Sequence, residues 1–153
     1  MNQAAIYVCA VVRKDGEILL VRQAEGHPLE GQWTVPWGAL ESGESPMSGA
    51  LREAWEEGGV HAKIEGLIGI QELPEPLSGS VAIVYMCRHI GGTPLPKDRE
   101  TDAAAYYTLA DLDSITEPVE PWSNWLIRRV YAGEIAVKLA DRTNPLQVHG
   151  AFL

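Results

Sequence analysis

The sequence predicts an α/β sandwich built on a mixed β-sheet. Strand-like apolar segments recur along the chain, two further segments carry the periodicity and end signals of helices, and these helices interrupt the series of strands. With 153 residues, 46% of them hydrophobic and 22% charged, the chain is long enough for one domain with a hydrophobic core. We therefore expect a single domain over residues 1–153, with the structure of the tail 134–153 left open.

A β-hairpin is expected near the start of the chain. Residues 4–12 (AAIYVCAVV) are rich in β-formers and too few to span a bilayer, which predicts a buried strand. Asp15-Gly16 predicts the turn, because glycine tolerates the positive φ of a tight hairpin, and residues 17–22 form the returning strand. A polar loop then leads to a short strand at residues 33–35.

The first helix is expected over residues 46–58, after a loop. Ser45 is a suitable N-cap, and Pro46 suits the first helical position, where a backbone N–H would have no partner. Gly58 and Gly59 end the helix by permitting a left-handed residue. These signals fix both ends of the helix.

This helix has one carboxylate side and one apolar side. At about 100° per residue, Glu53, Glu56 and Glu57 lie within an arc of roughly 100°. The side expected to pack on the sheet carries Met47, Ala50, Leu51, Ala54 and Trp55. Like charges at this spacing repel, by about 0.2–0.5 kcal/mol per pair, and their place near the helix end opposes the helix dipole. Bound divalent cations would explain the cluster, and a solvated acidic face is the ordinary alternative.

Further strands and a second helix are expected downstream. The strands span residues 60–72, 80–90 and 103–109, and the second is apolar enough to be central. A helical turn at 110–112 precedes a helix over 121–132, which ends at Gly133. Most of a stripe at helical spacing should pack on the sheet: Trp122, Trp125, Leu126, Arg129 and Val130. In the tail, residues 135–139 (IAVKL) are strand-like.

Charge and cysteine content restrict the classes of partner. The net charge of −9, from 21 acidic and 12 basic side chains, disfavours a long nucleic acid but not a small phosphorylated substrate held through metal ions. Cys9 and Cys87 lie in apolar segments and form no CxxC pair, so we expect two buried thiols. No apolar run suits a membrane span, and no basic region precedes the first apolar stretch, so a cytoplasmic protein is expected.

Residues 38–60, GALESGESPMSGALREAWEEGGV, resemble the signature of the Nudix hydrolases, G-x5-E-x7-R-E-U-x-E-E-x-G-U, where U is a bulky apolar residue. The seven fixed positions are filled by Gly38, Glu44, Arg52, Glu53, Glu56, Glu57 and Gly59, and Val60 fills the last apolar one. At ~7% frequency per residue, a chance match is on the order of 10⁻⁸ per starting position. The chain departs from the family pattern at Ala54, which is small, and at Trp37, where a second glycine is common.

The resemblance implies a Nudix-like α/β/α sandwich with a curved sheet, and hydrolysis of a nucleoside diphosphate linked to another moiety. The ligands of Mg²⁺ or Mn²⁺ would be Glu53, Glu56, Glu57 and the Gly38 carbonyl. Arg52 would orient the glutamates by ion pairing, and Glu44 would stabilise the loop or contact water on the metal. The general base is open between Glu53 and Glu100. Glu100 lies in a loop just before a strand, and could instead be a further metal ligand or a solvated carboxylate.

The substrate is less defined. Pro74 and Pro76 follow the signature at a distance similar to that in members that cleave ADP-ribose, so ADP-ribose or a related nucleotide sugar is expected. Arg22 could meet a phosphate or be an exposed structural arginine, and Trp37 could shape the substrate pocket or cover the loop. Trp33, Trp122 and Trp125 could stack on a base, although core packing is the better expectation. The four histidines form no ligand spacing and are assigned no role.

Other functions stay open on the sequence. One alternative is a pyrophosphatase that removes unwanted nucleoside triphosphates. Another is a catalytically silent, nucleotide-binding Nudix regulator, which the presence of all three helix glutamates disfavours. The simplest is a soluble α/β domain with an acidic helix. A homodimer is common among similar proteins.

Overall fold

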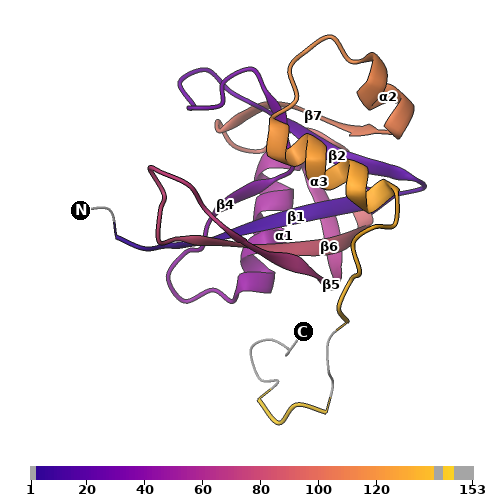
Figure 1. The fold of residues 1–153 in the computed structure, drawn as a ribbon. Coiled ribbons are helices and arrows are strands. Elements are labelled where there is room, and N and C mark those ends of the chain that lie inside the picture. Colours follow the sequence, from indigo (N-terminus) through magenta and orange to yellow (C-terminus); the bar gives the residue numbers. More distant parts are fainter. Residues whose placement is uncertain (1–2, 140–142, 147–153) are drawn as a thin grey trace.

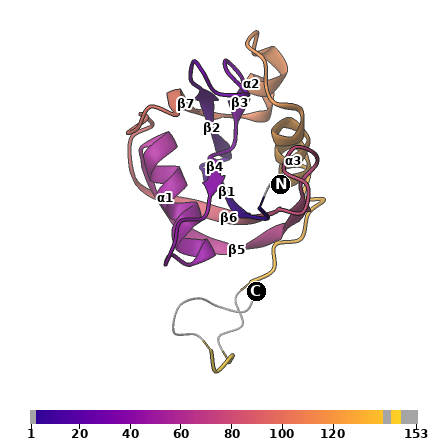
Figure 2. The ribbon, with the colours of Figure 1, turned by 90° about the vertical axis from the view of Figure 1, so that its left-hand side faces the viewer.

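A mixed, curved and unclosed β-sheet forms the middle layer of the structure, a computed structural model that describes residues 3–139 and 143–146 (Figure 1). Its seven strands are β1 (Ile6–Lys14), β2 (Glu17–Gln23), β3 (Trp33–Thr34), β4 (Trp37–Ala39), β5 (Val60–Glu72), β6 (Val81–Gly92) and β7 (Thr101–Tyr107). The helices are α1 (Pro46–Gly58), α2 (Leu109–Ser114) and α3 (Pro121–Tyr131). Because α1 covers one face of the sheet and α2 and α3 the other, the predicted α/β/α sandwich is confirmed (Figure 2).

Strand β1 lies at the centre of the sheet, and one edge of this strand pairs with two different strands. It pairs with β6 in parallel, and all the other named strand pairs are antiparallel. On the opposite edge, β1 pairs with β2 only beside the hairpin, and with β4 nearer its start. Strand β2 pairs instead with β3 and β7. This division places β4 against both β1 and α1.

The core follows from the alternation of side chains along β1 and β2. On one face, Val8, Ala10, Val12 and Leu19 pack with Ala50 and Ala54 of α1. On the other, Cys9, Val11, Ile18 and Leu20 pack with Leu126 and Ile127 of α3. Both cysteines are buried and free, as the sequence predicted.

The predictions that rest on turn and cap residues are confirmed. Asp15 and Gly16 have φ values of 49° and 80°, which form the tight hairpin turn. The Ser45 side chain accepts a hydrogen bond from the Ser48 N–H at 3.2 Å, and α1 has the predicted bounds. Gly59 ends α1 with a φ of 72°.

Strand β4 was not predicted from the sequence, because a strand of three residues leaves no periodic signal. In the tail, whose structure was left open, the strand-like residues 135–139 form an isolated bridge, in which Lys138 exchanges backbone hydrogen bonds with Leu67. The rest of the predicted tail, residues 140–142 and 147–153, lies outside the described residues.

Two tryptophans expected in the core lie at the surface. Trp55 of α1 is 36% exposed and stacks on His61, with 4.3 Å between the ring centroids. Trp125 of α3 is 47% exposed, and the Arg129 guanidinium lies 4.9 Å from its ring centroid. Their apolar surface is covered by a neighbouring side chain instead of by the sheet. Among the described residues, no helix has the length and apolar character that a membrane span needs.

Candidate metal centre and substrate cavity

Small residues bring α1 close to the sheet. The buried side of the helix consists of Gly49, Ala50, Glu53, Ala54, Glu57 and Gly58. A Cβ at Gly58 would lie 2.7 Å from Leu19 Cδ2, and one at Gly49 would lie 3.2 Å from Val8 Cγ2, so larger side chains would push the helix outward. This stripe is rotated by about 80° from the predicted apolar side, toward the glutamates. The predicted core-facing stripe from Met47 to Trp55 is therefore corrected.

Glu53 and Glu57 are buried as a result. Their exposed fractions are only 3% and 1%. Strand β4 lies directly against them: the Trp37 N–H donates to Glu57 Oε1 at 2.7 Å, and a Cβ at Gly38 would collide with the Glu53 carboxylate. Position 38 must therefore be glycine if the Glu53 carboxylate is to keep this place.

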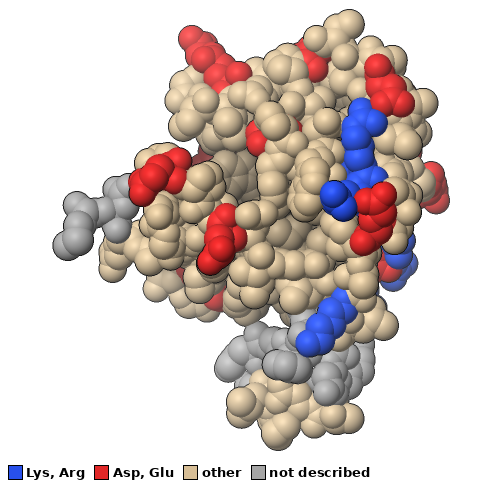
Figure 3. Space-filling model, viewed as in Figure 1, with Lys and Arg blue, Asp and Glu red and all other residues tan. Residues whose placement is uncertain are grey.

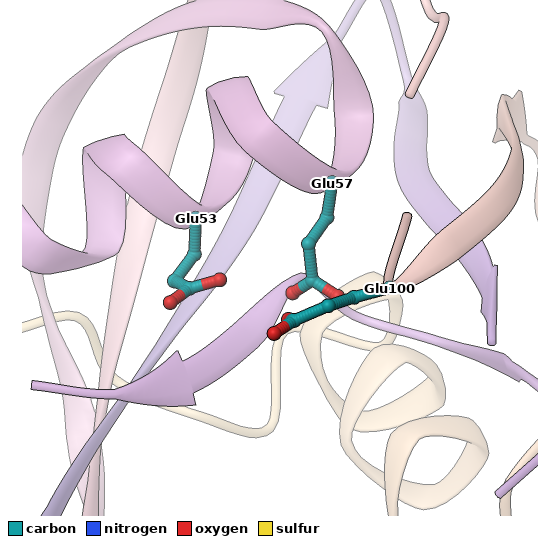
Figure 4. A group of neighbouring side chains, drawn as sticks. All are labelled: Glu53, Glu57 and Glu100. Carbon is teal, nitrogen blue, oxygen red and sulfur yellow. The ribbon is translucent and has the colours of Figure 1, made fainter. Parts of the chain in front are cut away.

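Glu100 approaches the same point from the segment before β7 (Figure 4). Glu53, Glu57 and Glu100 each place one carboxylate oxygen within 4.8 Å of the others. Two hydrogen bonds hold this segment: Thr101 Oγ1 donates to the Glu57 carbonyl at 2.8 Å, and the Ala24 N–H donates to the Glu100 carbonyl at 2.9 Å. The fold thus brings together three carboxylates that are up to 47 residues apart in the sequence.

Arg52 connects the helix glutamates with the preceding loop. Its guanidinium donates to Glu44 at 2.7 and 3.0 Å, to Glu53 at 2.7 Å and to Glu56 at 3.1 Å. It also donates to the Ala39 carbonyl at 3.1 Å. The resemblance implied such contacts for Arg52 and Glu44, and their roles in a reaction stay predictions. Glu56 belongs to this network and is not among the three carboxylates that lie within 4.8 Å of one another.

Burial controls the protonation of the inner carboxylates. Together with the charge of Glu53, burial raises the pKa of Glu57 to about 9, and burial is the larger cause. Burial also raises the pKa of Glu53 to about 7, against the opposing effect of Arg52. In contrast, the hydrogen bond from Arg52 lowers the pKa of Glu44. Glu53 and Glu57 thus have too little positive charge near them to keep both carboxylates ionised at neutral pH.

The carboxylate group has the properties of a divalent-cation site. Oε2 of Glu53 is buried and accepts no hydrogen bond from the described residues. Within the described part of the chain, neither Glu57 nor Glu100 forms an ion pair with a basic side chain. An all-oxygen set suits hard ions such as Mg²⁺ or Mn²⁺, which would supply the missing charge. The residues present therefore fit such an ion.

The raised pKa values predict how pH changes the stability of the metal-free chain. Between the ordinary glutamate value of 4.5 and the raised values, the folded chain holds protons that the unfolded chain has lost. Stability is therefore highest below about pH 4.5 for these groups and falls as pH rises toward about 9. We expect the Tm measured with chelator to fall over this range, and saturating Mg²⁺ to reduce the fall, since it prefers the ionised carboxylates.

A Glu57→Gln variant isolates this effect from that of other titrating groups. Its Tm in chelator is expected to depend less on pH than that of the native chain. Equal pH dependence in the two proteins would contradict the assigned protonation of Glu57.

A cavity of about 910 Å³ opens on the face hollowed between the loop after β5 and the start of α3, and Trp37, which donates to Glu57, is part of its lining (Figure 3). Its aromatic lining comes from Tyr7, Trp37 and Trp122, and residues 73–77 contribute leucine and proline side chains. Among the described residues, those that line it include no lysine or arginine. Its wall is thus suited to a planar apolar ring more than to a phosphate.

Trp37 lies where the cavity and the carboxylates meet. Its indole lines the cavity, 5.7 Å from the Tyr7 ring centroid, while its backbone N–H donates to Glu57. On the far side, the Glu120 carboxylate accepts the backbone N–H groups of the first turn of α3. Trp122 Nε1 donates to Gln71 Oε1 at 2.9 Å, which fixes the indole plane. The aromatic groups are therefore preorganised around the space.

Comparison with known proteins places this geometry in a family. The NUDIX domain model matches residues 1–130. The chain belongs to the Nudix family. A MutT-like protein of Streptomyces ambofaciens is 36% identical over 91 residues, covering 60% of this chain and 55% of that protein. An ADP-ribose pyrophosphatase of Methanocaldococcus jannaschii is 29% identical over 113 residues, covering 72% of this chain and 66% of that protein.

The chain thus spans about half to two thirds of the length of these curated relatives. Among solved structures, a NUDIX hydrolase from Nitrosomonas europaea superposes with a TM-score of 0.72 at 24% identity. That match covers 88% of this chain and 93% of the other, and it supports the fold.

The substrate-binding residues predicted around the Nudix signature lie in different places. Trp37 lines the cavity. Arg22 does not: it pairs with Asp102 and Glu117 at 2.7 Å each, so its proposed contact with a phosphate stays a prediction. Of the three tryptophans considered for base stacking, Trp122 lines the cavity, Trp33 is buried, and Trp125 is exposed.

His27 also lines the cavity, although no role was expected for the histidines from the sequence. Its place in the cavity depends on the conformation of the loop, which no local sequence motif predicts. The only available signal was its place in a loop between two predicted strands, which precedes the signature in the chain.

Proposed function

We propose that this chain is a divalent-metal-dependent pyrophosphohydrolase that cleaves a nucleoside diphosphate linked to another moiety. One observation carries the proposal: Glu53, Glu57 and Glu100 meet within 4.8 Å, and Trp37 connects Glu57 with an aromatic cavity whose described lining lacks basic side chains. A bound nucleotide therefore places its ring in the cavity and its diphosphate at the carboxylates. The reverse orientation would leave the phosphates beside aromatic and acidic groups.

The side chains of the site have separate roles in the proposed reaction. When bound, Mg²⁺ or Mn²⁺ supplies positive charge to the diphosphate oxygens and makes water more acidic. Glu53, Glu57 and Glu100 would hold the ion, with Glu56 and the Gly38 carbonyl as further candidate ligands. Arg52 and Glu44 fix the orientation of the helix glutamates.

Glu53 is the first candidate for the general base. Arg52 occupies its Oε1, and its Oε2 is left without a donor among the described residues, so in this role Oε2 would take the proton from water in place of binding the ion. Glu100 is the second candidate, because it lies at the exposed side of the group.

ADP-ribose is the substrate that we propose first. One relative at 29% identity is named an ADP-ribose pyrophosphatase. Pro74 and Pro76, which suggested this substrate class in the sequence, line the cavity together with Leu73 and Leu77. A nucleoside triphosphate is the alternative. A silent regulator is disfavoured, because the three carboxylates are present and lie together.

A substrate panel with product analysis tests the proposal. ADP-ribose, other nucleotide sugars and nucleoside triphosphates are incubated with the chain in Mg²⁺ and in chelator. We expect Mg²⁺-dependent conversion of ADP-ribose to AMP and ribose 5-phosphate. Pyrophosphate release from triphosphates without cleavage of ADP-ribose would favour the alternative. No hydrolysis of any substrate would contradict the enzymatic function.

A further inference from the structure

We propose that His27 is a substrate-binding residue, which donates a hydrogen bond from Nε2 to a phosphate oxygen at the junction of cavity and carboxylates. This inference rests on the proposed function, because it assumes that the diphosphate lies at the carboxylates. It assigns a role in ligand recognition to the loop between β2 and β3.

Backbone hydrogen bonds connect the loop of His27 with the segment of Glu100. The loop that carries His27 begins at Ala24, whose N–H donates to the Glu100 carbonyl at 2.9 Å. The loop is closed by further backbone hydrogen bonds, among them Glu30 N–H to the His27 carbonyl at 3.0 Å. Burial lowers the pKa of His27, and the charge of Glu100 opposes that shift. The loop and the proposed ligand Glu100 therefore form one connected unit.

The hydrogen bonding of His27 determines which ring nitrogen can donate. The Leu29 N–H donates to Nδ1 at 2.9 Å, so Nδ1 carries the lone pair and the proton of the neutral ring lies on Nε2. Burial lowers the pKa of His27, which favours this neutral form. Nε2 has no hydrogen-bond partner in the described part of the chain. The ring thus offers one free N–H donor with a fixed tautomer.

The orientation of the ring is also restricted. His27 is half-buried in the cavity wall and packs edge-on to Trp37, with 6.2 Å between the centroids and 90° between the planes. Trp37 in turn is hydrogen-bonded to Glu57 through its backbone. His27 therefore lies next to the residue that separates the apolar cavity from the carboxylates.

The composition of the cavity lining explains why a neutral hydrogen-bond donor would bind the diphosphate at this junction. The described cavity lining contains no lysine or arginine to contact the diphosphate. A hydrogen bond to a charged oxygen is stronger than one between neutral groups, and a donor whose tautomer is already set loses little entropy on binding. His27 can thus fix the diphosphate on the side away from the metal.

Two substitutions separate ligand binding from loop stabilisation. In His27→Asn, the side-chain oxygen can replace Nδ1 as acceptor for the Leu29 N–H, but no donor remains at the place of Nε2. In His27→Gln, the longer amide can place its N–H near that of Nε2. His61→Asn is the matched control, because His61 stacks on Trp55 and does not line the cavity.

For His27→Asn we expect an unchanged Tm, a rise in the KM for ADP-ribose of about 10- to 100-fold, and little change in kcat. His27→Gln should recover most of the lost affinity, and His61→Asn should match the native chain. A native KM in His27→Asn, or a Gln variant no better than the Asn variant, would overturn the proposal.

Binding calorimetry keeps this test independent of turnover. If the native chain hydrolyses no substrate, the proposed function fails, and the affinities of the variants for ADP-ribose still decide the role of His27. Equal affinities in the native chain and His27→Asn would overturn the inference by this route as well.

Discussion

Replacing Glu57 by glutamine is expected to lower turnover at least ~100-fold while the chain stays folded. Replacing a residue that only orients a metal ligand typically lowers metal affinity or activity about 10- to 100-fold. Glu57 is proposed to be a direct ligand, so its replacement should have at least that effect. The glutamine keeps the volume of the side chain and can still accept the Trp37 N–H through Oε1. Steady-state hydrolysis of ADP-ribose in Mg²⁺ measures the effect.

The same variant should be at least as stable as the native chain when no metal is bound. Glu57 is 1% exposed and its pKa is raised to about 9, so at neutral pH the metal-free chain must protonate it on folding, and glutamine removes this cost. We expect a Tm in chelator at neutral pH no lower than that of the native chain. Glu65→Gln is the control, because Glu65 forms an exposed ion pair with Arg13. Native turnover in Glu57→Gln would remove Glu57 from the site.

Replacing Arg52 by alanine is expected both to destabilise the chain and to abolish hydrolysis. Its guanidinium contacts Glu44, Glu53 and Glu56 while its side chain is only 19% exposed. Removing one partner of a buried ionic network costs about 3 kcal/mol, because the remaining charges stay buried without compensation. Denaturant unfolding and steady-state kinetics measure the two effects.

Arg52→Lys should be intermediate in stability but poor in activity. A lysine keeps the charge, but its single ammonium cannot reproduce the planar fork that reaches Glu44, Glu53 and the Ala39 carbonyl together. Arg13→Ala is the control and should change stability by less than about 1 kcal/mol, as expected for an exposed pair. If Arg52→Lys has native kinetics, the orientation of the glutamates does not depend on the fork.

Local sequence signals predicted the parts of the fold that local sterics decide. Asp15-Gly16 specified a turn that needs positive φ, and Ser45 and Gly59 specified the ends of α1. The residues of the signature come together for the same reason, since most lie on one helix or in the loop before it. Their contact through Arg52 follows from helical spacing and a short loop.

Contacts between distant segments were harder to predict. The apolar side of α1 was placed by hydrophobicity, but Gly49 and Gly58 determine which side approaches the sheet. This stripe of small residues was the signal that could have revealed the burial of Glu53 and Glu57. The rotation leaves Trp55 at the surface.

The cavity could not be predicted, because its lining comes from segments with no shared motif. Tyr7, Trp37 and Trp122 meet only after β4 has paired with β1 and α3 has packed on the opposite face of the sheet. His27 joins them through a loop whose conformation depends on backbone hydrogen bonds to Gln23 and Glu100. No hydrophobic periodicity and no motif spacing in the sequence predicts these contacts.

Binding of Mn²⁺ to the native chain, measured by the paramagnetic resonance of the free ion, tests the metal site most directly. Glu53→Gln and Glu57→Gln are titrated in parallel, with and without ADP-ribose. We expect the native chain to bind Mn²⁺ and each variant to bind it at least ~10-fold more weakly. Unchanged affinity in both variants, or no binding by the native chain even with ADP-ribose present, would contradict a cation site among these carboxylates.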